Sequence, residues 1–215
     1  TILAMERGAI DFVTKPGNVI EAKGEDFKKQ LLSVLTAVYN TQLYKRTTPD
    51  TFKPAGVAKH IRPVRTDRKL VALACSTGGP KALQSVIPYL PKNLDAPVVL
   101  VQHMPAGFTK SMADRLNELS EVSVKEAEEG DVLEKGHVYV APGGMHMEVV
   151  KAHGNTHRIK LDDLPPIGGL RPCANIMFDS LAKTDYDEII CIVLTGMGAD
   201  GTNGILSLNR TKPIH

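Results

Sequence analysis

The stretch Val71-Ala72-Leu73-Ala74-Cys75-Ser76-Thr77-Gly78-Gly79-Pro80 carries the strongest fold signal in the chain. The apolar run over residues 70–74 predicts a short buried strand, which stops at the small residues 76–79. Pro80 then opens a helix, because proline is favoured in the first helical turn. Such a turn places Ser76 above the carboxyl edge of a parallel sheet and leaves free backbone N–H groups at a helix N-terminus. The stretch predicts an α/β fold with Ser76 in the position of a nucleophile.

Length and composition limit the class of protein. The chain has 215 residues, of which 42% are hydrophobic, and a net charge of +2. That length suits one full domain, or one domain plus a fragment. The small net charge gives no reason to expect nucleic acid or a membrane surface, and we see no signal peptide or bilayer-length apolar run. Cys75, Cys173 and Cys191 are far apart and form no CxxC pair, which favours a cytoplasmic location and argues against disulfides or a zinc cluster.

The first 40 residues are predicted to be the tail of another domain. Residues 1–9 suggest a helix end with a glycine cap, residues 10–13 a strand, and residues 25–40 an amphipathic helix. The order Gly-Ala-Ile-Asp-Phe-Val-Thr-Lys-Pro at 8–16 resembles the last third of a response-regulator receiver domain. In that family the lysine before the proline contacts a phosphorylated aspartate. Lys15 matches this lysine, but the segment for the aspartate is absent, so Lys15 is also explained as a solvated turn residue.

The region after this fragment divides into a linker and a regular domain. Residues 41–69 are rich in Thr, Pro and basic side chains and predict a linker, whose basic residues are either solvated or form an interaction patch. Beyond it we expect helices at 80–89, 108–119 (capped by Thr109 or a neighbour), 174–182 and from 202, and strands at 70–74, 97–101, 123–127 and 188–194. Short segments at 138–142, 147–150 and 158–161 between glycine-rich turns predict an antiparallel excursion.

These elements define the predicted fold class. Fully apolar strands indicate a parallel sheet that is covered on both faces. We therefore predict an open, mainly parallel, doubly wound α/β sheet with an antiparallel hairpin excursion, preceded by a partial receiver-domain fragment. The predicted limits are 1–40 for the receiver part, 41–69 for the linker and 70–215 for a catalytic domain.

Three of the parallel strands end next to residues that carry chemistry. Ser76, His103 and Asp200 each follow a strand, and the carboxyl ends of parallel strands meet at one edge of a sheet. This set supplies a nucleophile, a general base and a carboxylate that orients the base. The N–H groups of Thr77 and Met197 are candidates for an oxyanion hole. In the alternative, His103 is a cap or core residue and Asp200 is part of an ordinary turn or helix cap.

Other residues compete with this interpretation. Cys75 is a rival nucleophile, but side chains alternate along a strand, so Cys75 and Ser76 are not expected to face the same cleft. Four histidines, at 137, 146, 153 and 157, are spaced too irregularly for a metal site, although His146 follows Gly144 and is a candidate neighbour of the active site.

The loop Gly196-x-Gly198-x-x-Gly201 matches a dinucleotide fingerprint between a strand and a helix. Against this, the acidic residue expected about 20 positions later is missing, and Asp200 would put a negative charge beside the pyrophosphate. A nucleotide-binding or signalling module without hydrolase activity is therefore the alternative function. A poorly folding fragment is the third hypothesis.

Five ordered motifs add a family resemblance. They are Ala74-x-Ser76-Thr77-Gly78-Gly79, Gln102-His103-Met104-Pro105, Ala141-Pro142-Gly143-Gly144 with His146, Arg171-Pro172, and Leu194-Thr195-Gly196-Met197-Gly198-x-Asp200-Gly201. Together they closely resemble the chemotaxis-specific protein-glutamate methylesterases, the CheB family, over about residues 69–208. Cys75 departs from this family, which usually has alanine there. The family domain also continues beyond its aspartate motif, so the resemblance predicts that this chain lacks the C-terminal end.

The resemblance implies a function and a set of partners. Members of this family are cytoplasmic response regulators that hydrolyse glutamyl methyl esters on chemoreceptor helices, release methanol, and in many cases deamidate receptor glutamines. They need no cofactor and form their triad at the positions of Ser76, His103 and Asp200. The Met197 amide, with that of Thr77, corresponds to the oxyanion donors. The expected partners are methylated chemoreceptor helices and, through an intact receiver domain, a histidine kinase; nucleic acid and membrane insertion are not expected. Phosphorylation control is not expected in a chain without the phosphoacceptor segment.

Overall fold

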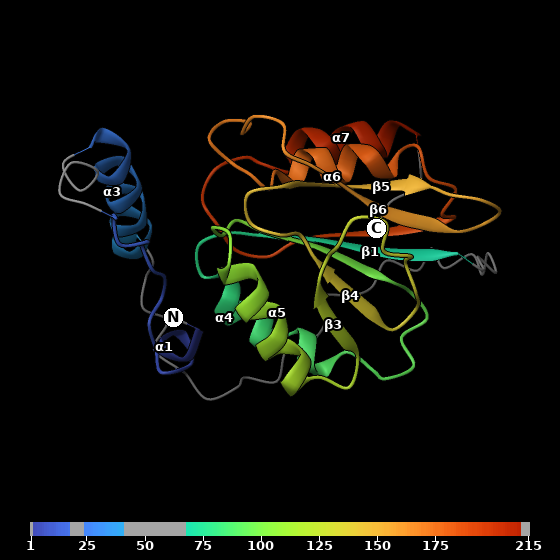
Figure 1. Cartoon of the computed structure of the whole chain (residues 1–215), viewed down its shortest axis with the longest axis horizontal. Helices are drawn as coiled ribbons and strands as arrows, with labels where there is room; N and C mark the ends of the chain where they lie inside the picture. The colour runs from blue at the N-terminus through green and yellow to red at the C-terminus, as the bar shows by residue number, and fades with distance from the viewer. Residues whose placement is uncertain (1, 18–23, 41–67, 212–215) are drawn as a thin grey trace, which may run out of the picture. The chain divides into compact units, whose positions relative to one another are not determined.

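The computed structural model describes residues 2–17, 24–40 and 68–211 of the chain (Figure 1). The chain separates into two compact units, Thr1–Thr14 with Asp67–His215, and Lys15–Thr66. The predicted linker lies almost entirely outside the described residues. No helix in the described ranges is both long and apolar enough to cross a membrane.

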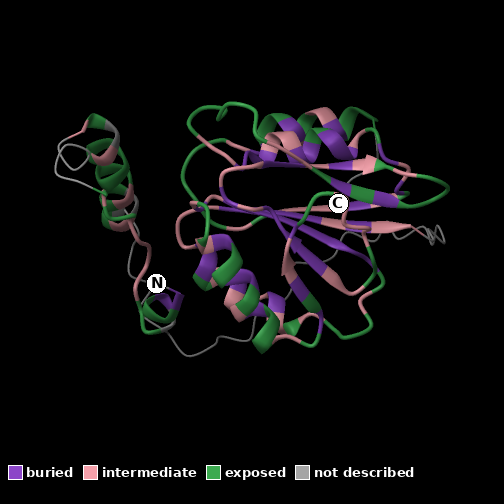
Figure 2. Ribbon diagram, viewed as in Figure 1, coloured by how far each residue is buried: buried purple, intermediate pink, exposed green. Residues whose placement is uncertain are grey.

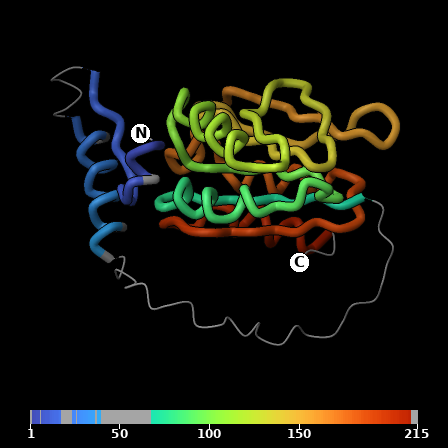
Figure 3. Tube along the Cα trace, turned by 90° about the horizontal axis from the view of Figure 1, so that it is seen from below, coloured from blue at the N-terminus to red at the C-terminus, as the bar shows by residue number. Residues whose placement is uncertain are grey.

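A five-stranded parallel sheet forms the centre of the first unit. Its strand order is β3 (Ser123–Glu126), β4 (His137–Val140), β2 (Val98–Gln102), β1 (Lys69–Cys75) and β7 (Glu188–Val193). Every neighbouring pair in this order is parallel. Figure 3 shows β1 and β7 side by side, although they come from distant parts of the chain. This arrangement confirms the predicted open, parallel α/β sheet.

Both faces of the sheet are covered. On one face lie α4 (Gly79–Gln84), the short 3₁₀ helix Ile87–Tyr89 and α5 (Phe108–Leu119). The other carries α6 (Ala174–Leu181), α7 (Thr202–Thr211) and the antiparallel hairpin β5 (His146–Lys151) and β6 (His157–Asp162).

A hydrophobic core lies on each face of the sheet, and successive residues of β1 point alternately into the two cores. Ala72 belongs to the core beneath α6, and Leu73 belongs to the core beneath α5. This is the alternation that the pleat of a strand produces, and the buried strands of Figure 2 follow from it. The strand ends that carry Ser76 and His103 are therefore anchored from both sides.

The N-terminal residues depart from one prediction. Helix α1 (Ile2–Glu6) is followed by Gly8, whose positive φ of 113° fits the predicted glycine cap. Residues 10–13 form no strand. Instead, the Phe12 ring packs against Phe108 at a centroid separation of 4.7 Å. The strand prediction is wrong because this apolar segment meets a helix rather than a strand.

The second unit contains one described helix. Helix α3 (Glu25–Asn40) has the predicted bounds. Its apolar positions Leu31, Leu32 and Leu35 are exposed. The assignment of residues 1–40 to a receiver domain, and the domain limits in general, stay predictions.

Three further predictions need correction. The segment at 138–142 does not belong to the antiparallel excursion: β4 lies in the parallel sheet because the connection from β3 crosses beside β6, where Gly130 N–H donates to Ile159 at 2.9 Å. The helix expected over 80–89 is divided: α4 ends at Gln84, and the separate 3₁₀ helix Ile87–Tyr89 follows, with Pro88 in its first turn, where proline is tolerated. Gly107, not Thr109, is the N-cap of α5, and the Thr109 hydroxyl donates to Glu126 at 2.5 Å.

Candidate active site

Ser76 lies in the tight turn that joins β1 to α4. Its N–H donates to the Thr195 carbonyl at 2.8 Å, and its own carbonyl accepts from Gly79 N–H at 2.7 Å. Gly78 adopts a left-handed conformation at φ 75°, which a residue with a side chain rarely accepts, and it caps α4. Pro80 occupies the first turn of this helix, as predicted. The turn therefore holds Ser76 at the carboxyl edge of the sheet.

The glycine-rich loop after β7 serves this serine. A Cβ at Gly196 would lie 2.7 Å from the Cβ of Ser76, so only glycine lets the loop approach so closely. Gly198 and Gly201 have φ values of 101° and 97°. The loop therefore owes its glycines to the packing against Ser76 and to its own turn geometry, which weakens the case for a nucleotide fingerprint.

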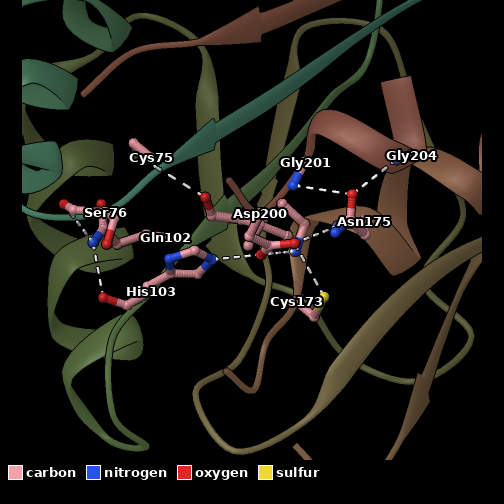
Figure 4. Close-up of polar contacts among 11 residues, drawn as sticks. Cys75, Ser76, Gln102, His103, Cys173, Asn175, Asp200, Gly201 and Gly204 are labelled. Carbon is pink, nitrogen blue, oxygen red and sulfur yellow. Dashed lines mark hydrogen bonds and ion pairs between the residues drawn. The ribbon is translucent and has the colours of Figure 1, made fainter. Parts of the chain in front are cut away.

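His103 follows β2 and faces Asp200 across the sheet edge. Its N–H donates to the Cys75 carbonyl at 3.0 Å, which fixes the backbone beside the Ser76 turn. Its Nε2 lies 2.8 Å from Oδ2 of Asp200 (Figure 4). The side chains of the two residues are only 14% and 6% exposed. Because a carboxylate accepts but does not donate, Nε2 carries a proton, and in the neutral imidazole Nδ1 is the nitrogen with the lone pair.

The Asp200 carboxylate has an unusually complete set of donors. Besides His103, it accepts the backbone N–H groups of Ala174 at 2.6 Å and Asn175 at 2.9 Å. The Cys173 thiol donates to it at 3.1 Å. Burial alone would raise the pKa of Asp200, but the hydrogen bonds from His103 and from the two amides outweigh it and hold the pKa well below its usual range. Asp200 is therefore a stable anion that orients the imidazole.

Ser76, His103 and Asp200 line one pocket of about 130 Å³, together with the 193–198 segment. In Figure 4, Nδ1 of His103 lies on the Ser76 side of the ring. Within the described part of the chain, no hydrogen bond joins Ser76 Oγ to His103. Hydrogen bonds of this kind are often long in unliganded enzymes and tighten when substrate binds. The structure therefore brings together the three residues that the sequence singled out.

The two predicted oxyanion donors differ in position. Met197 lines the pocket, whereas Thr77 is not among its lining residues. The Thr77 carbonyl accepts the Thr195 hydroxyl at 3.1 Å, which joins the turn after β1 to the loop after β7. In the described ranges neither the Thr77 nor the Met197 N–H has a hydrogen-bond partner. Both amides are therefore unpaired among the described residues, but only Met197 belongs to the lining of the pocket.

The rival nucleophile and the other histidines have different surroundings. Cys75 is also one of the residues that line the pocket, but its thiol packs in the core and donates to the Val101 carbonyl at 3.9 Å, and burial raises its pKa to about 12. A thiol with that pKa is unreactive near neutral pH. His146 is fully buried and contacts the Pro165 carbonyl at 3.2 Å, but it does not line the pocket. Among the described residues, no cluster of His, Cys, Asp or Glu suits a metal ion.

Gln102 supports the site and was not predicted from the sequence. Its side chain is buried, and its Nε2 donates to the carbonyl of Ser76 at 3.1 Å and to that of His103 at 2.9 Å. A Cβ at Gly79 would lie 1.9 Å from Gln102 Oε1, so the glycine leaves room for this amide. One side chain thus ties the turn of the nucleophile to the turn of the base. The sequence contained one signal for this role, namely that Gln102 is a polar residue at the end of an apolar run that predicts a buried strand.

The Gln102 contacts lead to a stability prediction. Gln102→Met keeps the length of the side chain but removes both donors, so we expect the free energy of unfolding to fall by about 1–3 kcal/mol. Gln84→Met makes the same chemical change where the buried amide nitrogen has no partner among the described residues, and we expect it to cost far less. Urea unfolding of both variants provides the comparison. Equal decreases in the free energy of unfolding for the two variants would contradict the proposal that the Gln102 hydrogen bonds hold the two turns together.

The Asp200 environment leads to a pH prediction. Its pKa is lower in the folded chain than the value of about 3.9 for an unfolded one, so its ionisation stabilises the fold above about pH 4. This contribution is lost as the pH falls. Asp200→Asn should therefore lower the free energy of unfolding most at neutral pH, with a difference from the parent that shrinks as the pH approaches about 3. Urea titrations across this range measure the difference; a pH-independent difference contradicts the prediction.

Comparisons with known proteins agree with this geometry. The family model for CheB methylesterase matches residues 71–214. The chain is 45% identical over 223 residues to a protein-glutamate methylesterase/protein-glutamine glutaminase of Oceanobacillus iheyensis, covering 100% of this chain and 62% of that protein. The protein of the same name from Geobacillus kaustophilus is 40% identical over 211 residues, covering 98% of this chain and 60% of the relative.

A solved structure shows the same fold. The crystal structure of the Thermotoga maritima CheB methylesterase catalytic domain superposes with a TM-score of 0.64 at 43% identity, covering 68% of this chain and 78% of that one. The chain spans about 60% of the length of the curated relatives. The family model and the full-length coverage of this chain by its relatives lead to one conclusion: the chain belongs to the CheB methylesterase family.

Proposed function

We propose that this protein is a serine hydrolase that removes methyl esters from glutamyl residues of chemoreceptors, releases methanol, and also deamidates receptor glutamines. The names of the relatives, protein-glutamate methylesterase/protein-glutamine glutaminase, support both reactions. The observation that carries the proposal is the 2.8 Å contact between His103 Nε2 and Asp200, which leaves Nδ1 free beside Ser76.

In the proposed acylation, Ser76 Oγ attacks the ester carbonyl carbon while Nδ1 of His103 takes the hydroxyl proton. Asp200 accepts the Nε2 proton in a hydrogen bond and stabilises the imidazolium as it forms. The carbonyl oxygen becomes an oxyanion, to which the free N–H groups of Met197 and Thr77 donate. Loss of one such donor typically costs about 3–4 kcal/mol of transition-state stabilisation.

The tetrahedral intermediate then collapses to an acyl-enzyme, which water hydrolyses in a second round of the same steps. The imidazolium returns its proton to the leaving methoxide, so methanol departs and a glutamyl ester with Ser76 remains. Water attacks this ester, His103 again accepts a proton, and the release of Ser76 leaves a free glutamate side chain. With a glutamine substrate the same steps expel ammonia, because the proton from His103 goes to the amide nitrogen.

The chemistry of the pocket supports neutral substrates. The lining residues in the described part of the chain include no lysine or arginine, and the buried anion Asp200 is one of them. Methyl esters and primary amides carry no charge, whereas the glutamate product does. The site should therefore bind both substrates better than the product, which favours product release.

The proposal extends to partners. Methylated chemoreceptor helices are the expected substrate, and a histidine kinase is the expected partner of an intact receiver domain. The nucleotide-binding alternative is not favoured, because Gly196 is explained by its packing against Ser76.

Methanol release from methylated chemoreceptor membranes tests the function. Ser76→Ala removes the nucleophile, so we expect turnover to fall by roughly 10⁶-fold. Cys75→Ala removes only a buried thiol of high pKa, so activity should remain close to that of the parent. Ammonia release from glutamine-containing receptor should fall in parallel with methanol release.

The controls separate the possible failures. Circular dichroism must show that each variant keeps its fold. A folded parent without methanol release, or a Ser76→Ala variant with full activity, contradicts the proposal. Nucleotide retained by the purified protein would instead favour the alternative.

A further inference from the structure

The helices α6 and α7 cap each other's N-termini, and Asp200 is one of the two caps. Asp200, just before α7, accepts the N–H groups of Ala174 and Asn175 in the first turn of α6. In return, Asn175 Oδ1 accepts Gly201 N–H at 3.1 Å and Gly204 N–H at 2.8 Å, at the start of α7 (Figure 4). Each carboxylate or amide oxygen satisfies N–H groups that a helix leaves unpaired.

This exchange requires the two helices to approach closely. A Cβ at Gly204 would lie 2.7 Å from the Asn175 carbonyl oxygen and 2.8 Å from Cβ of Phe178, so only glycine fits there. Phe178 is fully buried beneath this contact. The position of Asn175 relative to α7 is therefore set by packing.

The hydrogen bond from Gly201 to Asn175 also restrains Asp200, the residue before Gly201. Gly201 N belongs to the peptide bond that follows Asp200, so the Asn175 hydrogen bond holds one end of the Asp200 backbone. The N–H of Asn175 holds the other side, through the Asp200 carboxylate. The aspartate is thus clamped at its main chain and at its side chain by a single residue of α6.

We propose that Asn175 is a positioning residue for Asp200: its side-chain oxygen fixes the start of α7 so that the Asp200 carboxylate stays within hydrogen-bond distance of His103 Nε2. The role in catalysis rests on the proposed function, whereas the effect on the His103–Asp200 contact does not. Asn175 does not line the pocket, so it influences the reaction only through Asp200.

Three variants test the proposal. Asn175→Ala removes the oxygen, and Asn175→Asp restores an acceptor at the same position. Ser180→Ala is the control: it removes a different side-chain acceptor of α6, the buried hydroxyl that accepts Val149 N–H at 2.9 Å, at the far end of the helix from Asp200. If Asn175→Ala does not fold, Asn175→Ser, with a shorter acceptor, takes its place.

Kinetics provides the first measurement, below the melting temperature of every variant. We expect Asn175→Ala to lower kcat by about tenfold to a hundredfold with KM unchanged, as misplacement of a catalytic group does. Asn175→Asp should recover most of kcat. Ser180→Ala should lower the melting temperature without lowering kcat.

Proton NMR of the full chain provides a second measurement that needs no substrate. The Nε2 proton of His103, held by Asp200, should give a low-field resonance that is absent in His103→Ala. We expect this resonance in the parent, in Asn175→Asp and in Ser180→Ala, and its broadening or loss in Asn175→Ala. An Asn175→Ala variant that keeps the resonance overturns the proposal even if no chain hydrolyses esters; a kcat loss as large in Ser180→Ala overturns it as well.

Discussion

The hydrogen bond between His103 Nε2 and Asp200 Oδ2 is the interaction on which the site depends. It joins His103, which directly follows β2, to Asp200, in the segment between β7 and α7, across the central strand β1. Because the three strands run parallel, the segments that follow them meet at one edge of the sheet, where the two side chains come within 2.8 Å. The bond also determines which ring nitrogen is the base. Because Nε2 donates its proton to the carboxylate, the lone pair of the neutral ring is on Nδ1, the nitrogen on the Ser76 side.

Close backbone approaches, rather than large side chains, bring the segments of the site together. Gly196 allows the loop after β7 to touch Ser76, Gly79 makes room for the Gln102 amide, and Gly204 allows α7 to reach α6. At each of these close contacts a hydrogen bond holds a segment that carries Ser76, His103 or Asp200. The result is a preorganised carboxylate and imidazole, in which electrostatic stabilisation costs no reorganisation during the reaction.

The sequence predicted the elements that have strong local signals. The strand–turn–helix around Ser76, helix α3 and the three strand ends with Ser76, His103 and Asp200 were all identified. Tertiary contacts determined the parallel placement of β4, which depends on a crossover beside β6. The break between α4 and the 3₁₀ turn that contains Pro88 had a local signal, the proline itself, which the prediction did not use. The role of Asn175 arises from hydrogen bonds between distant segments, which no local pattern encodes. Gln102 stood out locally as a polar residue at the end of a buried strand, but only the fold shows which carbonyls it binds.

The central claim is that Ser76 is the nucleophile of the esterase, and covalent labelling tests it most directly. The chain would be treated with phenylmethanesulfonyl fluoride, which sulfonylates activated serines, while methanol release and the modified peptide are followed by activity assay and mass spectrometry. The account predicts that activity is lost in step with a single modification at Ser76, and that His103→Ala prevents it. Activity that survives complete sulfonylation of Ser76, or that disappears with modification elsewhere, would contradict the account.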